Sequence, residues 1–496
     1  MTSVAAKRDA PPSESPSEFV KAMSLTDATM LVAGSMIGSG VFIVAAGMGR
    51  TLGSPFWLIV AWVLTGVMTM LGALAYGELA AMYPRAGGQY VFLRESLGPL
   101  MGFLYGWTLF VVIQTGTIAA VAVAFGKFLG VLMPSVAPDV FAWFPHTTVA
   151  GGTIEIGLSA QRVVALIVIW FLTWINLRGV ETGKIVQTTF TVAKTAALAL
   201  LIILGLTIGR NAGAIAANFS SGHFLGSVDF TGSFAILFGS ALVGSLFSSD
   251  SWNNVTFAAA EVKDAKRNLP LALGLGTGLV TILYIMANVS YLNVLPFAGQ
   301  ANGADVLARG ITHATQDRVA TAAMEVMFGS SGGVIMAIAI LVSTFGCLNG
   351  IILAGARVYY AMARDGLFFR RVGALSARRV PAWGLIAQSI WASLLCFTGT
   401  YNQLLDYVIF AALIFYALTT IGLFVLRRTR PDAERPYRAF GYPLLPALYI
   451  VLAIAVAVCL LTADATRAQA FSGLVLVLLG VPVYYLWRKL AAPVPA

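Results

Sequence analysis

Two polar interruptions within apolar segments hold the residues of this sequence best suited to chemistry. Residues 34–42, GSMIGSGVF, and residues 244–254, GSLFSSDSWNN, place small and polar residues where a membrane helix would otherwise continue. A helix that breaks within a membrane leaves peptide N–H and C=O groups unpaired, which is tolerated only beside a cavity or a polar partner. N–H groups of a half-helix that starts near Ser39 suit a carboxylate, and carbonyl groups at the second break suit an ammonium. The two breaks therefore favour a site for a zwitterion such as an α-amino acid.

The glycines of the first break have a second interpretation. Gly34, Gly38 and Gly40 permit backbone conformations that a side chain forbids, and they let a ligand approach the main chain closely. Small residues at the spacing of Gly34 and Gly38 are also common where membrane helices pack together. The first break alone leaves both interpretations open. A matching break five helices later favours a transporter site near the membrane midplane.

Three of the charged residues within apolar segments bear on function. Lys194 is about ten residues into its segment, hence about 15 Å deep, where a lysine is costly and should have a role. It could replace a sodium ion, carry a proton or form a structural pair. Asp250 could cap a half-helix, face a substrate ammonium or carry a proton, and we favour capping because aspartate bonds readily to nearby backbone. Glu78, six residues before Pro84, is expected at a solvated helix end.

The elements that must position these residues are predicted to be membrane helices. Hydrophobic residues make up 58% of the chain and charged residues only 10%, which is far from the composition of a soluble domain. A bilayer core needs roughly 20 apolar residues per helix, and twelve such segments are apparent. Their approximate spans are 25–51, 56–82, 100–132, 162–178, 185–208, 231–259, 269–296, 332–364, 383–398, 403–427, 443–462 and 470–488.

These segments predict an all-α membrane protein with twelve transmembrane helices. The breaks in helices 1 and 6 predict a 5+5 inverted repeat, about 25–208 and 231–427, with two additional C-terminal helices at 443–488. Residues 1–22 are expected to form a disordered cytoplasmic tail, and residues 23–490 a single transport domain. Most lysines and arginines fall in alternate loops, which predicts a multi-pass protein of the cell membrane with both termini in the cytoplasm.

Several other classes of function find little support. The net charge of +10 follows from those loops, and no nucleic-acid-binding motif accompanies it. Cys347, Cys396 and Cys459 lie in apolar segments without metal-ligand spacing. The three histidines at 146, 223 and 313 fall in predicted external loops, so we expect neither catalysis nor a metal or other cofactor.

In these stretches the chain resembles the amino acid–polyamine–organocation superfamily, and within it bacterial members of the L-type amino acid transporter group. Residues 34–42 look like the family's helix 1 motif, residues 191–200 its helix 5 lysine segment, and residues 246–254 its helix 6 break. Further similar stretches follow in the same order: EVKDAKRNLP, STFGCLNG, RVYYAMARDG and RPDAERPYR. The resemblance covers about residues 22–450.

The resemblance implies a substrate site and a coupling site. The substrate carboxylate would be held by the backbone at Gly38, Ser39 and Gly40, and its amine by the carbonyls of Met36, Phe247 and Asp250. Ile37, Ser248 and Asn253 complete the predicted substrate-binding set, and Phe247 would also be an external gate. Lys194 resembles the lysine that takes the sodium position, bridging helix 1 to helix 8 near Ser343 and Thr344.

These residues predict a sodium-independent exchanger of neutral L-amino acids that works by alternating access. The alternatives are a proton-coupled symporter of amino acids, including cationic amino acids or amines, a non-transporting amino acid sensor, and a membrane enzyme. Many relatives have glycines and an aromatic residue in the helix 6 break where this chain has SSDS, so Asp250 bears on substrate preference. Animal members of the group join a heavy chain through an external cysteine. Residues 134–161 contain no cysteine, so we expect no covalent heavy chain. The expected partners are amino acids and membrane lipids.

Overall fold

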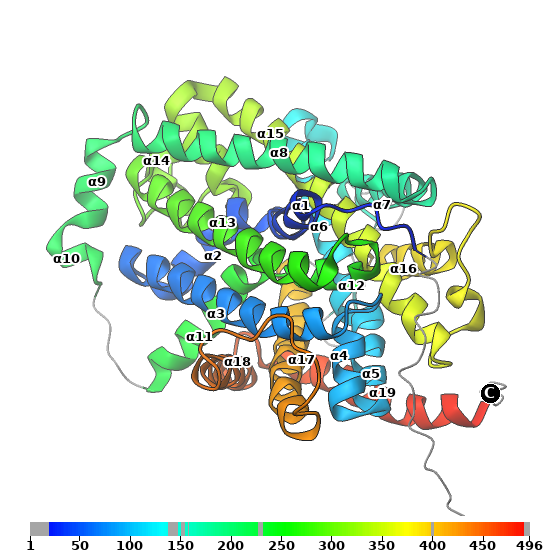
Figure 1. Cartoon of the computed structure of the whole chain (residues 1–496). Coiled ribbons are helices and arrows are strands. Elements are labelled where there is room, and N and C mark those ends of the chain that lie inside the picture. The colour runs from blue at the N-terminus through cyan, green and yellow to red at the C-terminus, as the bar shows by residue number, and fades with distance from the viewer. Residues whose placement is uncertain are drawn as a thin grey trace, which may run out of the picture.

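The computed structural model is a bundle of membrane-length helices (Figure 1). It describes residues 19–136, 147–149, 154–156, 158–226, 232–397 and 401–490. Within these ranges ten helices are long and apolar enough to cross a membrane, and two shorter apolar helices, Ser233–Ser248 and Ala382–Leu395, lie at the sixth and ninth predicted spans. The prediction of an all-helical membrane protein is confirmed. Most of the predicted tail, residues 1–18, lies outside the described ranges.

The first half of the chain forms the following elements: α1 (Leu25–Met36), α2 (Gly40–Leu52), α3 (Pro55–Met82), α4 (Gln89–Leu97), α5 (Pro99–Thr108), the π-helical η1 (Leu109–Ile113), α6 (Gln114–Leu132), η2 (Pro134–Val136), β1 (Thr147–Val149), β2 (Ile154–Ile156), α7 (Ala160–Leu177), α8 (Val180–Leu206), α9 (Ala212–Phe219) and α10 (Ser221–Phe224). The antiparallel pair of β1 and β2 is a small addition that the sequence interpretation did not anticipate.

The second half forms α11 (Gly232–Ser248), α12 (Asn254–Phe257), η3 (Ala259–Glu261), α13 (Ala265–Val294), α14 (Val306–Arg309), η4 (Thr315–Asp317), α15 (Val319–Arg364), η5 (Arg370–Gly373), α16 (Ala382–Leu395), α17 (Tyr401–Thr429), α18 (Leu444–Thr462) and α19 (Arg467–Leu490). The eighth predicted span, 332–364, is only the second part of α15. A kink at Phe328 and Gly329 joins it to a preceding helical segment, because Gly329 adopts a φ of 65° that other residues rarely tolerate.

Local sequence signals explain where the first helices begin and end. Ser24 and Asp27 form a capping box at the start of α1. Ser54 caps α3, where Pro55 occupies the first turn, and α2 ends at Gly53 in the left-handed conformation. In Figure 1, α8, α13 and α3 run across the molecule and α1 lies near its centre, in contact with α8, α13 and α15. The first break is therefore surrounded by other helices.

Candidate substrate site

The first helix breaks at the predicted place. Helix α1 ends at Met36 and α2 begins at Gly40, so Ile37, Gly38 and Ser39 lie between two half-helices. Ser39 is the N-cap of α2 and makes no side-chain capping bond to it. The first peptide N–H groups of any helix lack intrahelical acceptors, so this half-helix offers donors and a positive dipole end inside the bundle.

Close packing, rather than unusual dihedral angles, explains the glycines of this break. None of Gly34, Gly38 and Gly40 is among the glycines with positive φ. A Cβ at Gly40 would lie 2.1 Å from Ser248 Oγ and 2.9 Å from Ser248 Cα, and a Cβ at Gly38 would lie 3.0 Å from Cys347 Sγ. Gly40 thus brings the first break against α11. The expectation of backbone conformations forbidden to side chains was wrong, and the contacts of Gly38 and Gly40 match the helix-packing interpretation. Close approach of a ligand to this main chain stays a prediction.

The sixth membrane segment also breaks at the predicted place. Helix α11 ends at Ser248 and α12 begins at Asn254. Ser251 lies between them with φ of 66°, a left-handed conformation that is uncommon for serine. The peptide N–H of Asp250 donates to Phe247 O at 3.2 Å, so this carbonyl already has one donor. The two interrupted helices meet where Gly40 packs on Ser248.

Asp250 binds a neighbouring helix and does not cap α12. The N-cap of α12 is Asn253, so the capping prediction for Asp250 is wrong. The Tyr416 hydroxyl from α17 donates to Asp250 Oδ1 at 2.5 Å, and both side chains are buried. Asn253 Nδ2 in turn donates to Gln89 Oε1 at 2.8 Å. The second break is therefore fixed by side chains of α17 and α4, which are distant in sequence.

Lys194 reaches the first break as the resemblance implied. Its side chain is 1% exposed, and its ammonium donates to Gly34 O at 2.5 Å, Ile37 O at 2.7 Å and Ser343 O at 3.5 Å. Ser343 Oγ lies 3.2 Å from Ile37 O and 3.1 Å from Gly38 O, and its one proton can be donated to either. These donors satisfy carbonyl groups that the end of α1 leaves without helical partners. Lys194 and Ser343 thus tie the break to α8 and α15.

The remaining predicted residues are buried around the same region. Met36, Phe247 and Ser248 are 3%, 6% and 3% exposed, and Ile37 is fully buried. Thr344 is different, because its hydroxyl donates to Ile340 O at 2.9 Å within its own helix. No bond of Thr344 to Lys194 is among the described contacts.

Tyr284 is a site residue that sequence reasoning missed. Its hydroxyl, from α13, lies 2.9 Å from Met36 O and 3.1 Å from Ser248 O, so it bridges the last carbonyls of both half-helices. A hydroxyl has one proton and can donate to only one of them at a time. Met36 O was a predicted ammonium acceptor, and Tyr284 now occupies that position. A tyrosine in an apolar helix gives no sequence signal for this contact.

The space around the second break is nearly closed. One cavity of about 10 Å³ is lined by Asp250, Asn253 and Tyr416, and another of about 20 Å³ by Ser249, Asp250 and Trp252. Either volume suits about one water molecule, whereas ligand pockets commonly measure about 300–1,000 Å³. An amino acid fits in neither of these two cavities.

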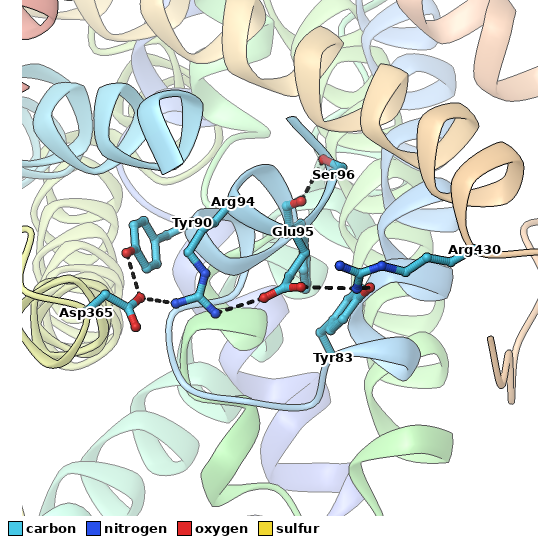
Figure 2. A network of polar contacts seen from close by, with 8 residues as sticks. Tyr83, Tyr90, Arg94, Glu95, Ser96, Asp365 and Arg430 are labelled. Carbon is cyan, nitrogen blue, oxygen red and sulfur yellow. Dashed lines mark hydrogen bonds and ion pairs between the residues drawn. The ribbon is translucent and has the colours of Figure 1, made fainter. Parts of the chain in front are cut away.

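A polar network joins the ends of α3, α4, α15 and α17. Figure 2 shows Glu95 between Arg94 and Arg430, with bonds of 2.9 and 3.1 Å. Arg430 also donates to the Tyr83 hydroxyl, and Asp365 accepts from Tyr90 and Arg94. Burial by itself would raise the pKa of Glu95, but the hydrogen bonds and charges of Arg94 and Arg430 outweigh it and lower that pKa.

Two buried ion pairs lie near the end of the molecule that carries α4. Arg357 on α15 contacts both oxygens of Glu261, at 2.9 and 3.2 Å, and both side chains are almost fully buried. Glu78 is fully buried and pairs with Arg427 and Arg435, so the expectation of a solvated position was wrong. At the opposite end, Arg50 pairs with Asp317 at 2.8 Å. Contacts therefore connect the helices at both ends of the bundle.

Comparison with known proteins identifies the family. The sequence model of the amino acid permease family matches residues 23–481, which is most of the chain. The chain belongs to the amino acid permease family. The predicted resemblance to the amino acid–polyamine–organocation superfamily is confirmed, and the protein is a multi-pass membrane protein.

The permease is similar along nearly its whole length to characterised transporters. It is 30% identical to the serine/threonine exchanger SteT of Bacillus subtilis, covering 95% of this chain and 97% of that protein. It is 29% identical to the b(0,+)-type amino acid transporter 1 of Rattus norvegicus, covering 96% and 91%. Identity to the large neutral amino acids transporter small subunit 2 of Homo sapiens is 30%, covering 94% and 80%. Among the described residues, no group of three or more His, Cys, Asp or Glu side chains is placed to hold a metal ion.

Proposed function

We propose that this permease is a sodium-independent exchanger of neutral L-amino acids and has no enzymatic activity. The observation that carries the proposal is the position of Lys194, whose ammonium contacts three carbonyl oxygens between the first break and α15. Carbonyl oxygens are also ligands for a hard cation, so a fixed ammonium can replace a bound ion there. The exchanger named among the similar proteins supports the mode of transport.

The two breaks supply the two halves of a zwitterion site. Peptide N–H groups at Gly38, Ser39 and Gly40 suit the substrate carboxylate, since they belong to the start of α2. Carbonyls of Met36, Phe247 and Asp250 are the proposed acceptors for the ammonium. An arriving ammonium would displace the Tyr284 hydroxyl from Met36 O, because both seek the same lone pairs. Phe247 is proposed to cover the bound substrate.

Contacts at the two ends of the bundle support alternating access. The cavities at the second break are too small for an amino acid, so the structure corresponds to a closed state. Opening one end requires parting Arg50 from Asp317, and opening the other requires parting the Glu95 and Glu261 networks. We assign the end with α4 and both termini to the cytoplasm, and we expect no covalent heavy chain, since residues 134–161 contain no cysteine.

Proton-coupled transport is the second candidate, and Asp250 favours it. Its buried carboxylate at the break could accept a proton or attract a cationic substrate. Transport would then quicken at low pH into vesicles that contain no amino acid.

Flux into proteoliposomes tests both candidates. Uptake of labelled L-serine and L-arginine would be measured in sodium-free buffer at two pH values, into empty vesicles and into vesicles preloaded with L-serine. Exchange predicts L-serine uptake only into preloaded vesicles, without change when sodium is added. Uptake into empty vesicles that rises at low pH would replace exchange with proton symport, and binding without flux would indicate a sensor.

A further inference from the structure

A cavity of about 380 Å³ lies at the N-terminal end of α15, at the opposite end of this helix from Asp365. It is formed by α14, η4 and the first part of α15, with Val131 at the end of α6 closing one side. This volume is within the usual range for a bound small molecule. The transport mechanism uses none of the lining residues.

The lining carries both signs of charge. Arg309 and Arg318 are half-buried, and Glu325 is exposed at the rim. Arg318 makes one long bond, 3.5 Å, to Lys127 O, so most of its donors remain available among the described contacts. Burial lowers the pKa of Arg318, partly offset by the charge of Glu325. Two guanidinium groups and one carboxylate give the cavity a net positive charge. Such a cavity suits a ligand in which an anionic group is joined to an ammonium, because the guanidinium groups bind the anion and the carboxylate binds the ammonium.

A buried hydroxyl of the same cavity lacks a partner. Thr321 is 7% exposed, and its Oγ1 has no hydrogen bond within the described part of the chain. A buried hydroxyl without a partner is unfavourable, so such a group points to a ligand or water that completes it. Thr321 lines the cavity and is placed to bind an oxygen of the ligand.

The cavity continues onto an apolar helix surface. It lies beside the kink at Phe328 and Gly329, which precedes the span predicted at 332–364. Val334 lines it and is 41% exposed, and Ile335 and Ile338 beyond it are 58% and 48% exposed. Exposed aliphatic side chains on a membrane helix contact acyl chains. A polar cavity above such a surface has the layout of a headgroup site.

We propose that this cavity binds a membrane phospholipid whose headgroup carries a phosphate and a primary ammonium, with its acyl chains along α15. Arg318 and Thr321 hold the phosphate, and Glu325 holds the ammonium. A free amino acid offers a similar pair of charges, but it would leave the apolar surface of Val334 and Ile335 unused. The site is separate from the proposed transport site, so it stands whether or not exchange is observed.

Native mass spectrometry of the purified full-length protein tests the proposal. The delipidated protein would be titrated separately with phosphatidylethanolamine, phosphatidylcholine and L-serine, and adducts would be counted. Phosphatidylcholine has the same phosphate but a methylated ammonium that cannot donate hydrogen bonds. We expect one phosphatidylethanolamine per protein, bound in preference to phosphatidylcholine.

Variants separate the two charges. Arg318→Gln should weaken phosphatidylethanolamine binding about tenfold, the equivalent of one charge-assisted hydrogen bond. Glu325→Gln, at an exposed position where folding is safe, should abolish the preference over phosphatidylcholine. Arg210→Gln removes an exposed arginine outside the cavity and should change neither. The proposal would be overturned if the wild type, like Glu325→Gln, bound phosphatidylethanolamine and phosphatidylcholine equally. So would an L-serine adduct that Arg318→Gln removes, because the ligand would then be the amino acid.

Discussion

Replacing Lys194 with methionine should stop transport while leaving the protein folded. Methionine keeps much of the side-chain volume and removes the ammonium. The two short bonds, to Gly34 O and Ile37 O at 2.5 and 2.7 Å, are charge-assisted and worth about 1.5–3 kcal/mol each. Their loss should shift the equilibrium away from the closed state by about 3–6 kcal/mol, a factor of about 10² to 10⁴ in population.

The effect on folding should be much smaller. Ile37 O keeps its bond from Ser343 Oγ, so Gly34 O is the main carbonyl left unpaired, at about 1–3 kcal/mol. Removing a buried ammonium also removes its desolvation penalty, which is several kcal/mol and offsets this loss. Melting temperature and purified yield should therefore stay close to those of the wild type.

The assay is exchange of labelled L-serine in preloaded, sodium-free proteoliposomes. The control is Lys266→Met, because Lys266 is half-exposed and pairs with the exposed Glu434, a pair worth about 0–1 kcal/mol. We expect exchange at the wild-type rate in the control and background flux in Lys194→Met. Wild-type exchange by folded Lys194→Met would refute the assignment of Lys194 to the closed state.

Three further predictions concern the breaks and the α4 end. Gly40→Ala should impair exchange and cost about 1–3 kcal/mol of stability, because its Cβ would overlap α11. Gly47→Ala should be tolerated, because its Cβ would have no atom nearer than 3.7 Å, and thermal unfolding and flux measurements compare the two variants. Tyr284→Phe should change the KM for L-serine more than the stability, since it frees Met36 O for a ligand ammonium at a cost of about 1 kcal/mol, and an unchanged KM would remove Tyr284 from the site. The pKa of Glu95 is below its ordinary 4.5, so the stabilisation that Glu95 gives the α4 end is present above pH 4.5 and is lost as the pH falls through the lowered pKa. Hydrogen exchange in α4 of the wild type should rise over that pH range, and Glu95→Gln should lack this pH dependence.

The breaks could be predicted because their cause is local. Both interruptions lie within residues 34–42 and 244–254, where several small and polar residues cluster in an apolar segment. Scattered glycines do not have this effect, because α3 and α13 continue through theirs. The depth of Lys194 follows from counting residues along a helix. Its position between helix 1 and Ser343 was expected from the resemblance, whereas its bonds to Gly34 O and Ile37 O could not be identified from the spacing of residues.

Contacts between distant helices could not be predicted in the same way. Tyr284 bridges two breaks from a third helix, and Tyr416 binds Asp250 from α17. Glu78 looked solvated because it is near a helix end, yet Arg427 and Arg435 fold over it. Such pairs depend on tertiary packing, which one sequence does not show. The inverted repeat and the roles of the site residues remain predictions.

The location of a bound amino acid would show whether the two breaks form the substrate site. An experimental structure of the full-length protein with L-serine would show where the ligand lies relative to the two breaks. We expect its carboxylate within hydrogen-bond distance of the N–H groups at Gly38, Ser39 and Gly40. Its ammonium should lie at the carbonyls of Met36, Phe247 and Asp250. A ligand bound away from both breaks, with Lys194 still on its three carbonyls, would contradict this assignment.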